Sequence, residues 1–414
     1  MRLDGLIEAG LLATALQQLQ QRHPKLRAAI AEGADGRLRY QFPQTVPPIP
    51  FEIADYYQGE THWREAARRL LDTELPASGP LARASVLRNR SSGQCELLLS
   101  LPHSITDGVS CIMLMDDLLA GYARAEGNAD LPGGPGLPIV TPSWAKESGG
   151  WRSRWRLLRR VARLMRDERT APLVPVPQGC GVPPLSQWVH WVFSRQDTIA
   201  LVRRCRQERS SLNGALLAAA CCGLIDCLPA ADGLVKWQMP FSLREALEGP
   251  AGPVTAQDLG CFVANMNGLS RITPHSRFWD LAREAHREVQ AFTDRGGPSF
   301  GYNASAGIYG MKVRLMRTLS LRTPRIAPPS LRPTLFATNY GVVNIRESYG
   351  SLRPQECTLI FKNELSGPLL VLEALVMGQR LNIGFAGSAL DPAFWERLQP
   401  AVRRQLEAAM GAGE

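Results

Sequence analysis

The chain has 414 residues, of which 45% are hydrophobic and 21% charged, a composition typical of a soluble globular protein with two or three domains. No apolar run reaches the roughly 20 residues that a bilayer-spanning helix needs, and the N-terminus lacks the basic and apolar regions of a signal peptide, so we expect a cytoplasmic protein. The formal charge of +9 favours a phosphate-bearing, acidic or anionic-membrane partner, or reflects a generally Arg-rich proteome.

The first part of the chain predicts helices alternating with strands. Leucines recur at helical spacing from residue 6, and Pro24 ends that run. The predicted helices are 6–21, 62–74 and 109–122, and the predicted strands are 37–42, 81–88 and 94–101, the last two forming a hairpin. Residues 127–143 are rich in Gly and Pro and predict a surface loop.

Residues 151–169 predict a basic amphipathic helix, because they carry eight arginines. One face carries the apolar residues Trp151, Trp155, Leu158, Ala162 and Met165. Three interpretations stay open: a solvated face of a helix that bridges two lobes, a docking site for an acidic acyl-carrier protein or the phosphates of CoA, and peripheral contact with a membrane surface. A second basic cluster, Lys312 to Arg325, is a candidate extension of this surface.

The five prolines between residues 171 and 184 predict a linker, and this linker divides the chain into an N-terminal lobe, 1–170, and a C-terminal lobe, 171–414. The second part again mixes both kinds of element. The predicted strands are 188–193, 234–240, 336–343, 369–377 and 381–385, with a turn into a strand at 259–263, and the predicted helices are 197–208, 212–227, 274–294 and one that begins at Asp391. The expected fold class is therefore mixed α/β.

The segment Leu101 to Gly108 carries the strongest chemical signal. His103 follows a predicted strand, and Asp107 and Gly108 stand at the start of a predicted helix, where Asp caps backbone N–H groups and Gly allows close approach. An imidazole fixed on such a turn suits proton transfer near neutral pH. From these residues alone, a catalytic and a structural role for His103 are equally open.

The segment His103-Ser104-Ile105-Thr106-Asp107-Gly108 resembles the HxxxDG core of the CoA-dependent acyltransferase superfamily. This superfamily includes chloramphenicol acetyltransferase, condensation domains of nonribosomal peptide synthetases, plant acyltransferases and mycobacterial polyketide-associated acyltransferases. Within it, the motifs of this chain most resemble those of the polyketide-associated and alcohol O-acyltransferases. Further similar segments follow in the family's order: Leu3-Asp4-Gly5, Arg22 to Arg27, Ser211 to Ala219, Met239 to Arg244, Leu259 to Phe262 and Thr338 to Gly341. The resemblance covers nearly the whole chain.

This resemblance implies two chloramphenicol-acetyltransferase-like lobes with an active-site channel between them. It implies that His103 acts as general base in the transfer of an acyl group from a CoA or carrier-protein thioester to a hydroxyl acceptor, which forms an ester. Asp107 and Gly108 would support the site, and Arg244 fits the arginine that pairs with the Asp by its position. Asn339 and Gly341 are candidates for the oxyanion donor or the channel wall.

The resemblance also implies the expected partners. No permanently bound cofactor is expected, since acyl-CoA or a phosphopantetheinyl thioester is the substrate. The acceptor is a small-molecule or lipid alcohol of secondary or lipid metabolism, and the protein is expected to be a monomer. Two alternatives stay open: an amide-forming condensation enzyme of a nonribosomal peptide pathway, and a non-catalytic descendant that binds a carrier protein or lipid.

Two departures from the family pattern bear on these expectations. The family usually has HHxxxDG, and Pro102 stands at the first His. The chain also begins close to the Leu3-Asp4-Gly5 element, where the family has a preceding strand, so a missing edge strand and a start further upstream are both open.

The remaining motifs point away from other chemistries. Residues 297–301 match GxSxG, but helical residues precede them and no His follows, so we do not expect a serine hydrolase. His103 and Asp107 have no third ligand at a suitable spacing, so no metal site is expected. The nine cysteines form no CxxC pair and predict reduced, mostly buried thiols. No nucleic-acid-binding motif accompanies the basic charge.

Overall fold

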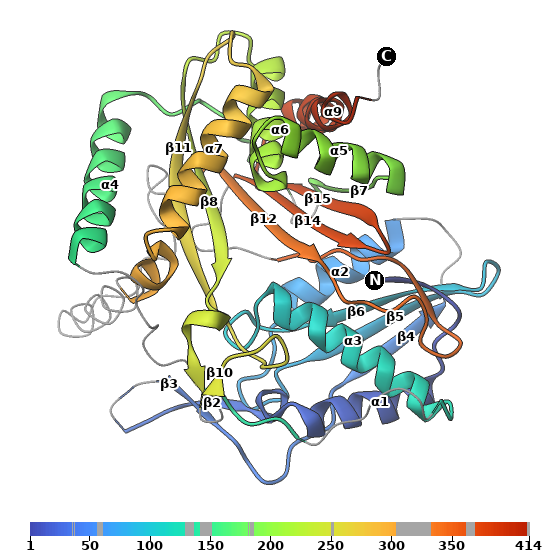
Figure 1. Ribbon diagram of the computed structural model, residues 1–414. Helices are drawn as coiled ribbons and strands as arrows, with labels where there is room; N and C mark the ends of the chain where they lie inside the picture. Colours follow the sequence, from blue (N-terminus) through green and yellow to red (C-terminus); the bar gives the residue numbers. More distant parts are fainter. Residues whose placement is uncertain are drawn as a thin grey trace.

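The computed structural model describes residues 1–34, 36, 38–55, 61–128, 136–140, 151–180, 182, 186–249, 252–303, 333–361 and 369–411. These residues form two α/β lobes, one above the other in Figure 1. Each lobe is built on one mixed sheet covered by helices, which confirms the fold class expected from the sequence. The second basic cluster, Lys312 to Arg325, and most of the loop at 127–143 lie outside the described residues.

The sheet of the first lobe has the strand order β13-β1-β6-β5-β4. These strands are β1 Arg2–Asp4, β4 Phe51–Asp55, β5 Arg83–Asn89, β6 Gln94–Ser100 and β13 Arg353–Glu356. β4 and β5 are parallel, and the other neighbours are antiparallel. β1 pairs with a strand on each side, so the segment at Leu3 lies inside the sheet and β13 forms the edge next to it.

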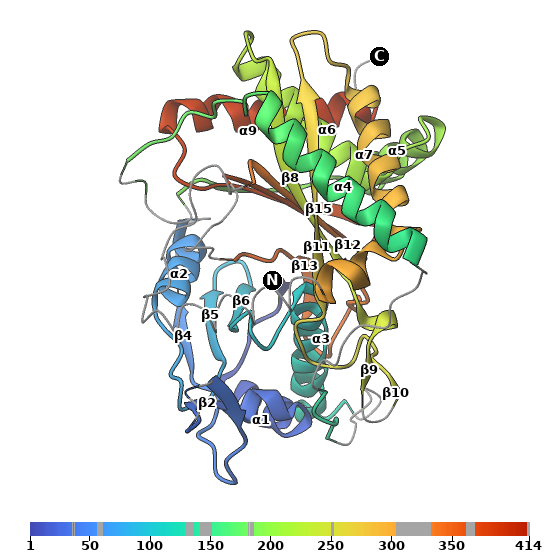
Figure 2. The same ribbon diagram turned by 90° about the vertical axis from the view of Figure 1, so that its left-hand side faces the viewer.

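Helices cover both faces of this first sheet (Figure 2). α1 (Ala9–Arg22) and α3 (Gly108–Ala125) lie against each other on one face, and α2 (Thr61–Asp72) lies on the other. The leucines that predicted α1 are its buried residues, and α3 buries Leu114 and Leu118 in the same core. The remaining elements are the short helix η1 Pro24–Arg27 and the hairpin of β2 Ala29–Glu32 with β3 Leu38–Gln41.

The sheet of the second lobe has the strand order β11-β8-β12-β14-β15-β7. Its strands are β7 Trp188–Val192, β8 Gly233–Ser242, β11 Val263–Ile272, β12 Leu335–Val342, β14 Leu370–Met377 and β15 Arg380–Gly387. Its outer face is covered by α5 Arg195–Gln207, α6 Leu212–Cys227, α7 Phe278–Thr293 and α9 Pro392–Ala409 (Figure 1). α6 is buried around nearly its whole circumference, because α7 and α9 pack against it as well as the sheet. Between β8 and β11 lie η2 Arg244–Ala246, β9 Glu248–Gly249 and β10 Gly252–Pro253.

The packing does not follow the predicted division into 1–170 and 171–414. α4 (Trp151–Thr170) packs on the second lobe, where Leu157 joins the core and Arg160 donates a hydrogen bond to the carbonyl oxygen of Asn267 on β11 at 2.7 Å. In the other direction, β13 completes the first sheet, and Tyr349 and Leu352 lie in the first-lobe core. We therefore place the division before α4, with the segment around β13 returning to the first lobe.

The predicted linker at residues 171–184 is partly built into the second lobe. Val174 and Val176 are buried in the core of that lobe, and Leu173 bridges Leu234 beside β8. The proline content therefore marks an extended segment that lies along the domain.

No single helix in the described part of the chain is long and apolar enough to cross a membrane. The sharply bent pair formed by α5 and α6 passes the same test of length and composition when the two helices are taken together.

Candidate active site

A cavity of about 560 Å³ lies between the lobes, with walls from α2, β6 and α3 on one side and β8, β11 and β12 on the other. His103, Thr106 and Gly108 line it on the first-lobe side. Much of the remaining wall is apolar and includes Leu70, Leu71, Ile112, Met115, Phe336 and Phe361. A concave, largely apolar site with a few polar groups is typical of a small-molecule or acyl-group pocket.

His103 lies on a tight turn that joins β6 to α3. The carbonyl oxygen of Pro102 accepts hydrogen bonds from the backbone N–H of Ile105 and from the Thr106 hydroxyl, both at 3.1 Å. The residue that replaces the first His of the family pattern therefore closes the turn through its backbone. A proline side chain at this position is compatible with the turn.

The imidazole of His103 is exposed to the cavity and is oriented through one ring nitrogen. Nδ1 lies 2.7 Å from the carbonyl oxygen of Thr106. A carbonyl oxygen only accepts, so Nδ1 carries the hydrogen in this contact. In the neutral ring Nε2 then has a free lone pair, which is the form that a general base needs.

Cys261 is a second neighbour of the same nitrogen, with its Sγ 3.7 Å from Nδ1 of His103. Its hydrogen-bond interaction with the ring is the main reason why the pKa of His103 is raised to about 9, although burial opposes the shift. Cys261 was not among the residues predicted for the site from the sequence. The available signal was its place in Leu259-Gly260-Cys261, the segment that resembles the "LGN" element of the family.

Replacing Cys261 with alanine is expected to lower the pKa of His103 towards its ordinary value. A general base works in its neutral form, so the rate in the wild type should rise as the pH passes through about 9. In Cys261→Ala this rise should move to lower pH, and activity at neutral pH should increase. The pH profile of kcat/KM measures the shift, and an NMR titration of His103 measures it without turnover.

The control for this prediction is Cys111→Ala, which removes a thiol that lines the cavity. It should leave the midpoint of the pH profile unchanged, because the thiol that lies 3.7 Å from Nδ1 of His103 is that of Cys261. Superimposable profiles for wild type and Cys261→Ala would contradict the role assigned to Cys261.

Asp107 caps α3 and ties the two lobes together. Its Oδ1 accepts from the backbone N–H of Ser110 at 2.8 Å and from Nη2 of Arg244 at 2.9 Å, and its Oδ2 accepts from Nη1 of Arg244 at 2.7 Å and from the backbone N–H of Phe262 at 3.0 Å. A carboxylate offers about four acceptor positions, and these contacts use all of them. The carboxylate is therefore committed to structure, and neither relays protons for His103 nor offers a free metal ligand.

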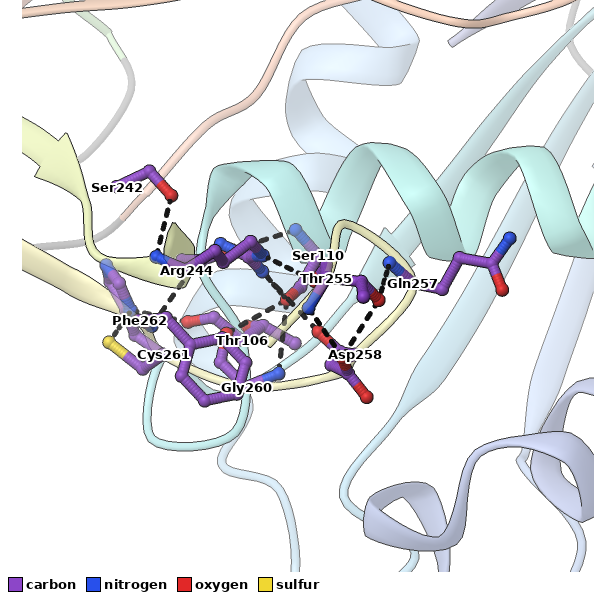
Figure 3. A network of polar contacts seen from close by, with 12 residues as sticks. Thr106, Ser110, Ser242, Arg244, Thr255, Gln257, Asp258, Gly260, Cys261 and Phe262 are labelled. Carbon is purple, nitrogen blue, oxygen red and sulfur yellow. Dashed lines mark hydrogen bonds and ion pairs between the residues drawn. The ribbon is translucent and has the colours of Figure 1, made fainter. Parts of the chain in front are cut away.

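Arg244 is buried opposite Asp107, as its position in the sequence predicts. Its guanidinium also donates to the Ser110 hydroxyl at 2.9 Å and to the carbonyl oxygen of Thr255 at 3.1 Å, and it lies 4.9 Å from the centre of the Phe262 ring. Figure 3 shows these groups converging from η2, the 255–262 segment and the start of α3. Burial alone would raise the pKa of Asp107, but the hydrogen bonds from Arg244 and from two backbone amides hold it below its usual range.

The backbone of Gly108 lies directly against an aromatic side chain of the second lobe. A Cβ atom at this position would overlap the ring of Tyr340 on β12. The glycine of the motif is therefore required because an aromatic ring from the other lobe occupies the place of a side chain.

Asn339 and Gly341, the residues predicted as oxyanion donors or channel wall, are not among the residues that line the cavity. Side chains alternate along a strand, and on β12 it is Phe336, Thr338 and Tyr340 that line the cavity. Asn339 faces the other way, and its Oδ1 accepts a hydrogen bond from the backbone N–H of Gly341 at 2.9 Å.

Two other sequence features have structural explanations. His23 is fully buried and its Nε2 lies 2.7 Å from Oδ2 of Asp117 on α3, so the segment Arg22 to Arg27 anchors that helix. Ser299 of the GxSxG match is buried within a helical stretch at 297–303, which lacks the strand that a nucleophile elbow needs.

Comparison with known proteins agrees with this architecture. Residues 1–148 match the family model of the condensation domain. The chain is 28% identical over 173 residues to surfactin synthase subunit 2 from Bacillus subtilis, a match that covers 40% of this chain and 5% of that protein. The chain spans no more than 8% of the length of any curated relative among the five it matches.

Solved structures extend the similarity to the whole chain. Polyketide synthase associated protein 5 from Mycobacterium tuberculosis has a TM-score of 0.67 at 21% identity, covering 100% of this chain and 94% of that one. The first condensation domain of the CDA synthetase has a TM-score of 0.62 at 15% identity, covering 99% and 90%. The resemblance seen in the motifs is thus confirmed: the first 148 residues match the condensation-domain family, and the whole chain shares its fold with solved condensation domains and with polyketide synthase associated protein 5.

Proposed function

We propose that this protein is a condensation enzyme that transfers an acyl group from a carrier-protein phosphopantetheinyl thioester to an amine acceptor, with His103 as general base. The observation that carries the proposal is the contact from Nδ1 of His103 to the Thr106 carbonyl oxygen at 2.7 Å. This contact leaves Nε2 available at a cavity bounded by both lobes. The match of residues 1–148 to the condensation domain supports the amide-forming reaction.

In the proposed reaction, His103 accounts for the movement of the proton between the acceptor and the leaving thiolate. The acceptor nitrogen attacks the thioester carbonyl carbon, and Nε2 of His103 takes the proton that the nitrogen loses. The tetrahedral intermediate then collapses, the carbon–sulfur bond breaks, and the leaving thiolate takes the proton from the imidazolium. Positioned general-base catalysis contributes roughly 10²–10⁴-fold to the rate, and holding both substrates together in the cavity contributes further.

The start of α3 is our candidate for stabilising the oxyanion. Gly108 is the first residue of that helix and lines the cavity beside His103. The Ser110 N–H at this end already donates to Asp107, so the proposed donors are the backbone N–H groups of Gly108 and Val109, together with the positive end of the helix dipole. Arg244 and Asp107 act on the reaction through this helix, as positioning residues.

The donor is expected to carry an apolar acyl group. The lining side chains Leu70, Ile112, Met115 and Phe336 offer aliphatic and aromatic contacts. The similarity to surfactin synthase subunit 2 favours a carrier-bound donor over free acyl-CoA.

A hydroxyl acceptor is the second candidate. It is supported by the full-length fold similarity to polyketide synthase associated protein 5, together with the resemblance of the HxxxDG segment to polyketide-associated acyltransferases. The chemistry at His103 is the same for both acceptors, since the base takes one proton from the attacking atom in either case.

The test is a reconstituted transfer assay. The protein is mixed with a holo-carrier protein loaded with a medium-length acyl group, and amine and alcohol acceptors of matched size are added in separate reactions. We expect acceptor-dependent release of the carrier thiol with an equal amount of amide, read by mass spectrometry. Ester formed with alcohols alone would establish the second candidate, and no thiol release with either acceptor would point to a non-catalytic binding role and overturn the proposal.

A further inference from the structure

α4 lies on the outside of the second lobe, alongside β11 and α7 (Figures 1 and 2). Only one narrow side of the helix faces the protein. Leu157 is buried in the core, and the buried Arg160 binds the Asn267 carbonyl oxygen and pairs with Glu288 of α7 at 3.3 Å. A helix fixed by one side presents the rest of its surface outward.

The outward surface of α4 carries several large apolar side chains. Trp151 is 68% exposed, Trp155 56%, Leu158 51% and Met165 60%. With 3.6 residues per turn, these positions form one stripe along the helix, and Val161 borders it. Of the ten large hydrophobic side chains exposed in the described part of the chain, five belong to this helix. A gathered apolar surface of this kind marks an interaction site.

Arginines flank the apolar stripe on its exposed side. Arg152, Arg156 and Arg159 fall on the neighbouring sector of the helix, and all three are exposed. The guanidiniums of Arg152 and Arg159 lie 5.6 Å from the ring centres of Trp151 and Trp155. Tryptophan at headgroup depth beside arginines that reach phosphate is the arrangement of helices that lie in a membrane interface.

We propose that α4 docks the protein onto an anionic lipid bilayer, lying in the plane of the surface with Trp151, Trp155, Leu158 and Met165 inserted at the headgroup boundary. The basic sector complements the negative surface, and the apolar stripe contacts the acyl boundary. The apolar stripe runs along about 20 Å of straight helix with arginines beside it, which fits a flat anionic surface; binding to an acidic carrier protein in place of lipid is one of the outcomes of the experiment. This inference is independent of the reaction at His103.

The experiment is vesicle co-sedimentation of the full chain. Vesicles of phosphatidylcholine alone are compared with vesicles that also contain phosphatidylglycerol. We expect binding to the anionic vesicles that weakens as salt is added. Trp151→Glu combined with Trp155→Glu should weaken binding by about tenfold or more for each tryptophan, and Arg152→Ala combined with Arg156→Ala by about fivefold for each arginine.

The matched control is Ile199→Glu, which places the same charge at an apolar residue that is 54% exposed on α5 of the same lobe. This variant should bind like wild type. All substituted side chains are exposed, so folding is checked by the melting temperature and should be unchanged. The proposal is overturned if wild type does not bind anionic vesicles, if the double tryptophan variant binds as well as wild type, or if these residues bind an acidic carrier protein and no vesicle.

Discussion

His103→Ala is expected to lower the rate of acyl transfer by roughly 10²–10⁴-fold, the contribution of a positioned general base, without a change in melting temperature. The imidazole is exposed to the cavity, and its hydrogen bond at Nδ1 to Thr106 is replaceable by water. Little packing is therefore lost with the side chain. Turnover of the carrier-bound donor measures the rate, and thermal unfolding measures the stability.

The control for His103→Ala is Ser104→Ala, on the same turn. Ser104 is exposed, and its backbone carbonyl oxygen accepts a hydrogen bond from the Tyr40 hydroxyl at 2.9 Å. This contact survives the substitution, so rate and melting temperature should both match wild type. If His103→Ala kept wild-type turnover, the base-assisted mechanism would be wrong.

Arg244→Ala is expected to lower the free energy of unfolding by about 3–5 kcal/mol, because it leaves the buried carboxylate of Asp107 without its partner. Side-chain exposure is 7% for Arg244 and 1% for Asp107, so water does not replace the lost contacts. The rate should fall as well, since the start of α3 and the His103 turn lose their tie to the second lobe. Denaturant unfolding and the transfer assay measure the two effects.

A surface pair provides the control for Arg244→Ala. Arg271 and Asp232 form an ion pair with side-chain exposures of 64% and 56%, and Arg271→Ala should lower the free energy of unfolding by no more than about 1 kcal/mol.

The ion pair of Asp107 with Arg244 also predicts that the fold is sensitive to acid. Its carboxyl pKa lies below the unfolded value, so the pair stabilises the fold above the ordinary Asp range and this stabilisation is lost as the pH falls. An unfolding transition in Arg244→Ala that matches that of the wild type would contradict the stabilising role of the Asp107–Arg244 pair.

The sequence predicted the periodic elements of this fold well and the short ones poorly. α1, α3 and α6 carry sustained helical patterns, and β5 with β6 carries a hairpin signal. β1 and β13 have only three and four residues, and both depend on partners far away in the chain: β1 lies between β6 and β13, and β13 pairs with β1 across more than three hundred positions. No local pattern contains that pairing, so a pass along the sequence does not find it.

The residues of the candidate site also differ in how far the sequence predicts them. The pairing of Asp107 with Arg244 follows from the order of the motifs, whereas the order of the motifs does not show that Asn339 lies on the other face of its strand from Thr338 and Tyr340, because adjacent residues of a strand face opposite ways. The face that β12 turns to the cavity is set by its neighbours in the sheet. For α4, the amphipathic pattern predicted the helix but not which side of it packs on the protein. The packed side carries Leu157 and Arg160, and the apolar face lies outward.

The placement of β13 has a consequence for how the polypeptide reaches its native state. The first sheet is incomplete until residues 353–356 have been synthesised, and until then β1 has unpaired backbone groups along one edge. Contacts this distant in sequence slow folding, because a long loop must close before they form. The nascent first lobe therefore waits on the ribosome with an open edge while most of the second lobe is made, and a fragment ending near residue 150 would retain that edge as a site of aggregation.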